Sequence, residues 1–494
     1  MAASDFVVVI LAAGKGTRLK SGLTKVLHRA GGRTLVEHVV RACRPLGARA
    51  IVAVVGHQAE DVSAAVEPLG VRAVLQQPQR GTGHALVVAR RAIGPRKFAV
   101  VVPGDAPLVR TETLKKLMRT HQASQAAATI LTAQLADPTS YGRIFRKQDG
   151  KVAAIVEESA LADDQRAINE INSGIYCFTL EKLWPCLDKL RPDNLHRELY
   201  LTDAIALLNQ AGDAVLAEGA ADAQEVLGCN TLAEIAQVDQ IFRQRKRAEL
   251  MDAGVSIQLP DTVLIDPEVE IGPDTAIEPC VQLLGKTRIG SGCAIRTGSV
   301  LSDAVLEDNV TVKPHCVVAS SRLAKGATVG PFAHLRDGAQ LRPGARVGNY
   351  VEVKKSVLAE GVKAMHLSYI GDASIGRDTN VGAGTITCNY DGVRKNRTTI
   401  GKRVFVGSDT ALVAPIRVGD GAYIAAGSTV TDNVPPNALA IARGRQENKP
   451  GWAAKRRREM AAAAKPRKKS RPRAKRKPRR AARARKARRP ARRR

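Results

Sequence analysis

The chain has 494 residues, which is too long for one hydrophobic core of ordinary size, so we expect two or more domains. Its hydrophobic content of 44% is ample for globular packing, whereas only 3% of the residues are aromatic, which predicts cores built from Val, Ile, Leu and Ala. The formal net charge is +30, and the segment from Lys455 to Arg494, with 23 Lys or Arg and one acidic residue, contributes +22 of it. The strong charge therefore belongs to a C-terminal tail and not to the body of the protein.

Two classes of protein are disfavoured at once. The sequence contains no apolar run long enough to cross a bilayer and does not begin like a signal peptide, so we expect a cytoplasmic protein without membrane insertion. No two of the eight cysteines are separated by two or three residues, which argues against a zinc site of familiar spacing. Disulfides are not expected in a reducing cytosol.

Short apolar runs alternate with helix-like segments over residues 1–230, and this order predicts an α/β domain with a mostly parallel sheet and helices on both faces. The predicted strands are 6–12, 50–55, 71–76, 98–102, 126–135 and 174–178, and the predicted helices include 34–43 and 59–66.

The first predicted strand runs into a glycine-rich loop, Leu-Ala-Ala-Gly-Lys-Gly-Thr-Arg-Leu, over residues 11–19. Such a loop is typical of a phosphate site, because glycine lets the backbone approach a nucleotide and backbone N–H groups can surround its phosphate oxygens. Lys15, Arg18 and Lys25 add positive charge nearby. The spacing is neither that of a Rossmann fingerprint nor that of a P-loop, and the loop alone is also typical of an ordinary strand-to-helix turn.

Asp105 directly follows the predicted strand 98–102. At the carboxyl edge of a parallel sheet a carboxylate is well placed to hold a divalent cation, which can balance the negative charge of a bound phosphate. Taken alone, Asp105 is equally a turn-forming residue.

Residues 231–253 are predicted to form a linking helix, with Leu232, Ile235, Val238 and Phe242 at helical spacing. Beyond residue 254 the period changes to six. Aliphatic residues recur in three ladders, over 265–295, 323–353 and 400–430. Neither a helix nor a hairpin keeps such a stripe on one face, so residues 254–451 are predicted to form a parallel β-helix with three hexads to a coil.

The ladder is interrupted around residues 353–368 and 388–399, where we expect loops that carry function. His366 lies in the first interruption. Imidazole, whose ordinary pKa lies near neutrality, is the natural general base for a reaction at neutral pH. A lone histidine is usually structural, but Glu352 and Lys354 share one face of a predicted strand close by.

Residues 452–494 consist mainly of Lys, Arg, Ala and Pro, so we expect a disordered tail. Its charge favours weak, non-specific contact with nucleic acid or another polyanion. A solubilising extension without a partner is the alternative.

From about residue 5 to residue 446 the sequence resembles one enzyme family, the bifunctional N-acetylglucosamine-1-phosphate uridyltransferases and glucosamine-1-phosphate N-acetyltransferases. The motifs that carry the resemblance are the loop 11–19 with Lys25-Val26-Leu27, the segment 76–85, Gly104-Asp105, Tyr141-Gly142-Arg143, Glu170 to Gly174, Met365 to Tyr369, and the segment 382–392. The resemblance implies a Rossmann-like α/β nucleotidyltransferase domain followed by a left-handed β-helix of hexapeptide repeats in a homotrimer. It also implies acetyl transfer from acetyl-CoA to glucosamine 1-phosphate, then Mg²⁺-dependent transfer of UMP from UTP to N-acetylglucosamine 1-phosphate.

The resemblance also implies roles for individual residues. The uridine nucleotide would be held by Leu11, Ala12, Ala13, Gly14, Gln76, Gly81 and Thr82, and the amino-sugar by Gly142, Glu157 and Asn172. Arg18 and Lys25 would contact the phosphates, and Asp105 and Asn230 would ligate Mg²⁺. An Asn before a helix is also a common N-cap, so Asn230 has a second interpretation.

In the second site, His366 would be the base, and Arg336, Lys354, Tyr369 and Asn380 would bind the sugar phosphate. Asn389 and Tyr390 would line both the sugar and the acetyl-CoA site. Acetyl-CoA would be contacted by Ala383, Ser408, Ala426 and Arg443.

Three positions depart from the family pattern: Thr24 and Pro103 in the first site and His334 beside Arg336 in the second. A single-activity sugar-1-phosphate nucleotidyltransferase with a structural β-helix remains the alternative to a bifunctional enzyme.

Overall fold

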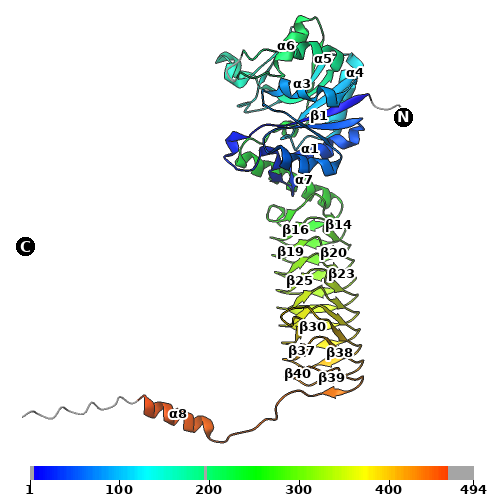
Figure 1. Ribbon diagram of the computed structural model, residues 1–494, viewed down its shortest axis with the longest axis vertical. Coiled ribbons are helices and arrows are strands. Elements are labelled where there is room, and N and C mark those ends of the chain that lie inside the picture. Colours follow the sequence, from blue (N-terminus) through cyan, green and yellow to red (C-terminus); the bar gives the residue numbers. More distant parts are fainter. Residues whose placement is uncertain (1–4, 194–196, 465–494) are drawn as a thin grey trace, which may run out of the picture. The chain divides into compact units, whose positions relative to one another are not determined.

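The structure is a computed structural model that describes residues 5–193 and 197–464 (Figure 1). It divides into two compact units, the first ending at Ala442 and the second beginning at Arg443. The first unit contains both an α/β part and a β-helix. The domain boundaries predicted at 230/231, 253/254 and 451/452 stay predictions.

The α/β part is built on a sheet with the strand order β11-β7-β10-β6-β1-β4-β5, and β8 and β9 extend it beside β10. Within that row only β10 runs against its neighbours, so the sheet is mostly parallel, as predicted. The strands are β1 Phe6–Ala12, β4 Ala50–Val55, β5 Arg72–Leu75, β6 Phe98–Pro103, β7 Ala128–Gln134, β8 Arg143–Arg146, β9 Val152–Val156, β10 Glu170–Thr179 and β11 Val215–Gly219, with a separate pair β2 Arg29–Ala30 and β3 Arg33–Thr34.

Helices cover both faces of this sheet because its central strand is apolar on both sides. Val7 and Val9 of β1 lie in one core cluster with α3, α5 and α6, whereas Val8 and Ile10 lie in another with α1, α2 and α4. The helices are α1 Leu35–Cys43, α2 Ala59–Val66, α3 Thr82–Ile93, α4 Thr111–Ser124, α5 Leu180–Leu187 and α6 Asp203–Gln210.

The predicted linking helix is α7, Leu232–Asp252, and it begins with a capping box between Thr231 and Glu234. Its apolar face packs through Ile235, Val238 and Ile241 against the α/β part. Leu232 is 57% exposed, so its predicted place on this face is wrong, since the first turn lies outside the contact.

The β-helix consists of three parallel sheets whose strands follow one another in rotation, as the six-residue period predicts. The first sheet contains β12 Ser256–Ile257, β15 Ala276–Ile277, β18 Ala294–Ile295, β21 Thr311–Val312, β24 Thr328–Val329, β27 Arg346–Asn349, β30 Lys363–His366, β33 Asn380–Val381, β36 Phe405–Val406, β39 Tyr423–Ile424 and β41 Leu439–Ala440. The second contains β13 Leu264–Ile265, β16 Gln282–Leu284, β19 Val300–Ser302, β22 Val317–Ala319, β25 His334–Arg336, β28 Glu352–Lys354, β31 Tyr369–Gly371, β34 Ile386–Cys388, β37 Ala411–Val413 and β40 Thr429–Val430. The third contains β14 Glu270–Ile271, β17 Arg288–Ile289, β20 Val305–Leu306, β23 Arg322–Leu323, β26 Gln340–Leu341, β29 Val357–Leu358, β32 Ala373–Ile375, β35 Thr398–Ile400 and β38 Ile416–Val418.

The ladder residues of all three predicted runs are buried and form one continuous core. The first interruption, 353–368, is not a loop, because β28, β29 and β30 continue through it. There the step from Val353 to Leu358 is five residues in place of six, which shortens a corner and keeps the stacking. The second interruption does contain a loop, between the end of β34 at Cys388 and the start of β35 at Thr398.

The prediction of disorder is wrong for the first part of the tail, where Trp452–Ala463 forms the helix α8. Ala, Arg and Lys are strong helix formers, and Arg456 contacts Glu459 one turn later at 3.6 Å, so the segment is helical with no buried side chain. The rest of the predicted tail, residues 465–494, lies outside the described residues.

No helix within residues 5–193 and 197–464 is both long and apolar enough to cross a bilayer. All eight cysteines are free thiols, and six of them are buried.

Candidate active sites

The predicted phosphate loop leaves the carboxyl end of β1 and is held there by its neighbours. The carbonyl oxygen of Leu11 accepts a hydrogen bond from Gly104 N (2.8 Å), and that of Ala13 accepts one from His57 N (3.2 Å). Gly16 has φ +62°, and a Cβ on it would lie 2.7 Å from Cβ of Lys25. The absence of a side chain at Gly16 therefore lets Lys25 pack directly against the loop.

Four predicted residues from distant parts of the chain meet beside this loop. The ammonium of Lys25 contacts the carboxylate of Asp105 and donates a hydrogen bond to Oδ1 of Asn230 (2.7 Å). Arg18 donates to the same oxygen at 3.0 Å. Asn230 is not the N-cap of α7, which is Thr231, so its amide is free to face this cluster.

The cluster offers the ligands that a divalent cation prefers. Asp105 and Asn230 both present oxygen, and a Cβ on Gly228 would lie 3.6 Å from Oδ2 of Asp105 and 3.8 Å from Nδ2 of Asn230, so the two side chains converge. The Lys25 ammonium already bridges their oxygens, so positive charge suits this position. One carboxylate, one amide oxygen and substrate phosphates form a typical Mg²⁺ environment. The described residues hold no cluster of three or more His, Cys, Asp or Glu side chains of metal-site geometry.

The start of α3 forms the next part of the site. Gly81, with φ +96°, precedes the helix, and its carbonyl oxygen accepts a hydrogen bond from Nε2 of Gln76 at 2.9 Å. The hydroxyl of Thr82 accepts one from Leu201 N at 3.0 Å, which attaches the chain around residue 201 to α3. Backbone N–H groups at this helix start are suited to an anion.

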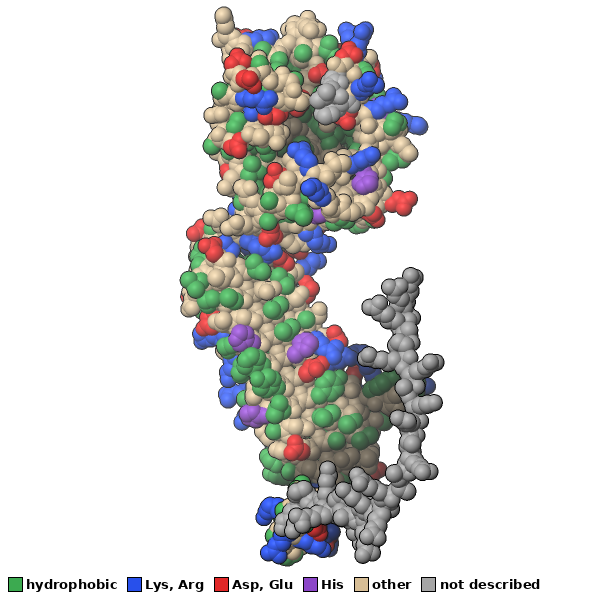
Figure 2. Space-filling view, turned by 90° about the vertical axis from the view of Figure 1, so that its left-hand side faces the viewer, with side chains coloured by type: hydrophobic (Ala, Val, Ile, Leu, Met, Phe, Trp, Pro, Cys, Tyr) green, Lys and Arg blue, Asp and Glu red, His purple; other side chains and the backbone are tan. Residues whose placement is uncertain are grey.

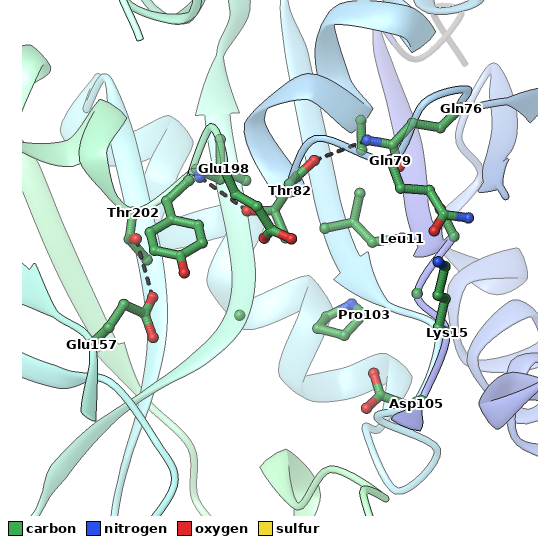
Figure 3. A pocket seen from close by; sticks show the side chains of 18 of the residues that line it. Leu11, Lys15, Gln76, Gln79, Thr82, Pro103, Asp105, Glu157, Glu198 and Thr202 are labelled. Atoms are coloured by element: carbon green, nitrogen blue, oxygen red, sulfur yellow. Dashed lines mark hydrogen bonds between the residues drawn. The ribbon is translucent and has the colours of Figure 1, made fainter. Parts of the chain in front are cut away.

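The opposite wall carries polar groups suited to a sugar. Thr202 donates a hydrogen bond to Oε1 of Glu157 at 3.1 Å, and burial raises the pKa of the Glu157 carboxyl above its ordinary value. Asn172 donates to the hydroxyl of Tyr176 at 2.8 Å, and its own backbone N donates to the carbonyl oxygen of Gly142. Figure 3 shows Glu157 and Thr202 on one side of the pocket and Lys15 and Asp105 on the other.

These two walls enclose a pocket of about 720 Å³, which is the size of a site for a nucleotide with its sugar. The predicted residues that line it are Leu11, Ala13, Gly14, Gln76, Gly81, Thr82, Asp105, Glu157 and Asn172. Ala12 does not, because its side chain is 1% exposed in the core beneath the loop. Arg18, Lys25, Gly142 and Asn230 are not among the lining residues.

Several lining residues were not predicted as parts of the site: Gln79, Tyr176, Glu198, Tyr200, Leu201 and Thr202. Gln79 lies in the motif segment 76–85 and Tyr176 lies two residues after the motif Glu170 to Gly174, so both could have been predicted from their neighbours in the sequence. The segment 198–202 belongs to no motif, and only the folded chain brings it to the pocket.

The second site lies on the outer face of the second β-helix sheet. His334, Glu352 and Tyr369 form one outward row by register, and Arg336, Lys354 and Gly371 form the next. Arg336 pairs with Glu352 at 2.7 Å. His334, the departure from the family pattern, therefore stands in register with Glu352, two residues before Arg336 on the same strand.

Tyr369, Asn389 and Lys354 are brought together in that second site. A Cβ on Gly371 would lie 2.5 Å from the Tyr369 hydroxyl and 2.7 Å from Nδ2 of Asn389, so both side chains pack directly against this glycine. Asn389 also donates to Asp372 at 2.6 Å. Lys395, which was not predicted, comes from the 389–397 loop, and the neighbouring Lys354 ammonium lowers the pKa of Lys395. Two ammonium groups side by side suit an anionic ligand.

His366 ends β30 at the corner between the first and second sheets, where its Nδ1 lies 2.9 Å from Oδ1 of Asn349. The predicted acetyl-CoA residues follow it on later coils at the same corner: Ala383 after β33, Ser408 after β36 and Ala426 after β39. Backbone hydrogen bonds join these corners, from Asp409 N to Ala383 O and from Gly427 N to Ser408 O.

Three predicted residues belong to other parts of the chain. Asn380 stands on β33 of the first sheet, in register with Lys363. Tyr390 is 60% exposed in the 389–397 loop. Arg443 belongs to the second compact unit.

Hydrophobic side chains and histidines are exposed along the β-helix surface (Figure 2). Next to the His366 corner, Phe332, Tyr350 and Leu367 are 47%, 58% and 62% exposed, and the rings of Phe332 and Tyr350 stack at 5.4 Å. An apolar column of this kind marks an interaction surface.

Comparisons with known proteins agree with this arrangement. The MobA-like NTP transferase domain matches residues 8–171, and the six-repeat bacterial transferase hexapeptide family matches residues 397–432. The fold is thus an α/β nucleotidyltransferase domain followed by a left-handed parallel β-helix, as predicted. A solved UDP-glucose pyrophosphorylase with UDP-glucose covers 48% of this chain at 17% identity, with a TM-score of only 0.40.

Curated relatives cover nearly the whole chain. The bifunctional protein GlmU of Koribacter versatilis (strain Ellin345) is 50% identical over 92% of this chain and 98% of its own length. That of Pelobacter propionicus is 47% identical over 90% and 97%, and that of Streptococcus agalactiae serotype V is 45% identical over 91% and 97%. The chain belongs to the family of bifunctional GlmU proteins, the uridyltransferase and acetyltransferase enzymes that its motifs resemble.

Proposed function

We propose that this protein makes UDP-N-acetylglucosamine in two steps at two separate sites. It acetylates glucosamine 1-phosphate with acetyl-CoA, then transfers UMP from UTP to N-acetylglucosamine 1-phosphate and releases pyrophosphate. The observation that carries the proposal is the meeting of Arg18, Lys25, Asp105 and Asn230 at one end of a pocket whose other end holds Glu157. Cations and oxygen ligands suit phosphates, and buried hydrogen-bonding groups suit a sugar.

In uridyl transfer, a phosphate oxygen of N-acetylglucosamine 1-phosphate attacks the α-phosphorus of UTP, and the bond to the bridging oxygen of the β-phosphate breaks. Arg18 and Lys25 stabilise the negative charge that develops on the phosphoryl oxygens. Asp105 and Asn230 would hold Mg²⁺, which supplies further positive charge to the phosphates when bound. No side chain becomes covalently attached, because the sugar phosphate provides its own nucleophile.

Binding in this first site follows from the two walls of the pocket. The loop residues Leu11, Ala13 and Gly14, with Gln76, Gly81 and Thr82, hold the uridine nucleotide. On the other wall Glu157, Asn172 and Gly142 orient the amino-sugar. Ala12 acts through the backbone, since its side chain is buried.

In acetyl transfer, His366 accepts a proton from the amino group of glucosamine 1-phosphate. The amine nitrogen attacks the thioester carbonyl, the carbon–sulfur bond breaks, and coenzyme A leaves as the thiol once its sulfur is protonated. The sugar phosphate is bound by Arg336, Lys354, Tyr369 and Asn380, and Lys395 adds a further positive charge. Acetyl-CoA is bound by Ala383, Ser408 and Ala426 along the His366 corner and by Asn389 and Tyr390 of the neighbouring loop, and Arg443 is a further predicted contact.

A homotrimer in the cytoplasm completes the proposal. The apolar column of Phe332, Tyr350 and Leu367 beside His366 supports it, because a second copy of the chain would cover this column and complete the acetyl site. Light scattering of the full chain tests the assembly, with three times the mass of one chain expected. The eight free thiols agree with a reducing compartment.

The decisive assay supplies glucosamine 1-phosphate, acetyl-CoA, UTP and Mg²⁺ to the wild type and to His366→Ala and Asp105→Ala. Each variant should lose only its own half-reaction. If the wild type uses N-acetylglucosamine 1-phosphate but releases no coenzyme A thiol, the β-helix is structural and the protein is a single-activity nucleotidyltransferase.

We propose weak polyanion binding as an accessory property of the C-terminal segment. The exposed residues Lys455 to Arg458 on α8 support it, as does the charge of +22 from Lys455 onward. Deletion of residues 452–494 should abolish salt-sensitive binding to nucleic acid of arbitrary sequence. Unchanged affinity after the deletion would contradict this property.

A further inference from the structure

The corner at His366 differs from the other corners of its sheet. In the first β-helix sheet β27 and β30 are four residues long, whereas every other strand that the structure describes there has two. The extra residues carry the pairing of β27 with β30 beyond the core, so that Asn349 and His366 become register partners. Gly348 permits this approach, because a Cβ there would overlap the carbonyl oxygen of Met365.

Two hydrogen bonds hold the peptide group that joins His366 to Leu367. The next amide, Leu367 N, donates to the carbonyl oxygen of Asn349 at 3.0 Å. The hydroxyl of Ser368 donates to the carbonyl oxygen of His366 at 2.8 Å and is itself buried. The ring therefore starts from a rigid position, although the side chain is exposed.

The ring is held by one hydrogen bond whose direction decides its protonation pattern. Nδ1 of His366 lies 2.9 Å from Oδ1 of Asn349. An amide oxygen can only accept, so Nδ1 carries the hydrogen, and the lone pair of neutral imidazole then lies on Nε2.

We propose that Asn349 is a positioning residue for acetyl transfer: it holds His366 in the Nδ1–H tautomer, so that Nε2 accepts the proton of the substrate amine. The inference rests on the proposed acetyltransferase function. Asn349 touches neither the amine nor the thioester. It acts through the ring, whose orientation it fixes by the hydrogen bond at Nδ1.

The structure singles out the acceptor oxygen, so one variant removes the whole amide and a second restores an acceptor oxygen. Asn349→Leu keeps the size of the side chain and removes the acceptor, whereas Asn349→Asp keeps an acceptor oxygen and removes the amide donor. We expect Asn349→Leu to lower kcat for thiol release by about 100-fold with little change in KM, because a misplaced base slows the chemical step. Asn349→Asp should recover most of that loss.

Two controls separate a positioning role from a structural one. Uridyl transfer, measured with N-acetylglucosamine 1-phosphate in the same full-length variants, should stay at the wild-type rate and reports an intact α/β part, while an unchanged KM for glucosamine 1-phosphate reports an intact acetyl site. Gln340→Leu removes a strand amide from a different sheet and should leave kcat for thiol release unchanged.

Wild-type kcat in Asn349→Leu, or Asn349→Asp as slow as Asn349→Leu, would overturn the positioning role while leaving the acetyltransferase function in place. A loss in KM alone would also overturn it. Absence of thiol release from the wild type would instead overturn the proposed acetyl transfer itself, and the role of Asn349 with it.

Discussion

Acidification should destabilise the α/β part through His121, a histidine that the two sites do not use. Its side chain on α4 is fully buried, with Nδ1 3.0 Å from the hydroxyl of Thr129 and Nε2 3.1 Å from that of Thr179. The Thr179 hydroxyl donates its hydrogen to the carbonyl oxygen of Ala126 at 2.7 Å. Its oxygen therefore accepts from Nε2–H, and Nδ1 accepts from Thr129, which is an arrangement only neutral imidazole can satisfy.

Burial lowers the pKa of His121 from 6.5 to about 4 in the folded protein. The unfolded chain therefore binds a proton first as the pH falls, and stability is lost between pH 6.5 and about pH 4. With 1.36 kcal/mol for each pH unit of difference, the whole loss is about 3 kcal/mol, and about 2 kcal/mol of it is already present at pH 5.

The assay compares the wild type with His121→Gln, which offers a donor and an acceptor but does not titrate in this range. Urea unfolding is followed through Trp184, whose ring packs against the α/β core, with Trp452→Phe in both proteins to remove the other tryptophan. Between pH 8 and pH 5 the wild type should lose about 2 kcal/mol more than the variant. The buried His38, whose pKa burial also lowers to about 4, cancels in this comparison. An equal loss in both proteins would refute the reasoning.

Three further predictions concern the sites. Gly16→Ala should slow uridyl transfer at least about tenfold and leave thiol release unchanged, because the new Cβ would displace Lys25. Equal uridyl-transfer rates in the variant and the wild type would show that the loop tolerates a movement of Lys25. Glu157→Gln should raise the thermal unfolding temperature at pH 7, because burial raises the pKa of Glu157 and its ionised form therefore destabilises the folded protein above pH 4.5. The gain should vanish as the pH falls below 4.5, and uridyl transfer should weaken. A lower unfolding temperature of the variant at pH 7 would contradict this. Lys395→Met should raise KM for glucosamine 1-phosphate about tenfold at nearly constant kcat, because only one of the two adjacent ammonium groups, that of Lys354, then remains. An unchanged KM in steady-state kinetics would exclude Lys395 from phosphate binding.

The elements that could be predicted are those with local causes. The strand before the glycine loop is Phe6–Ala12 as predicted, because a short apolar run followed by glycines is typical of a strand buried on both faces of a parallel sheet. The β-helix could be predicted from the six-residue ladder, because each coil repeats the hydrophobic pattern of the coil before it. The interruption at 353–368 was misread because a corner shortened by one residue and an inserted loop both break the ladder in the same way.

Parts of the sites depended on contacts between distant segments. Asn230 has the sequence position of an N-cap, and only the packing of α7 shows that Thr231 takes that role and leaves Asn230 beside Lys25. Thr202 reaches Glu157 because the chain around residue 201 attaches to α3 through Thr82. Nothing in the sequence near Thr202 encodes that contact.

The sequence by itself determined the two-part architecture, the glycine-rich loop after β1 and the family, and it predicted roles for Asp105 and His366, because periodicity and motif order are local properties of the chain. Only the tertiary structure decided which groups meet: Lys25 with Asp105 and Asn230, Lys354 with Lys395, and Asn349 with His366. These meetings arise from the register between strands and from glycines such as Gly348, at which a Cβ would prevent two backbones from approaching. Register and close approach are properties of the packed coils and not of any single segment.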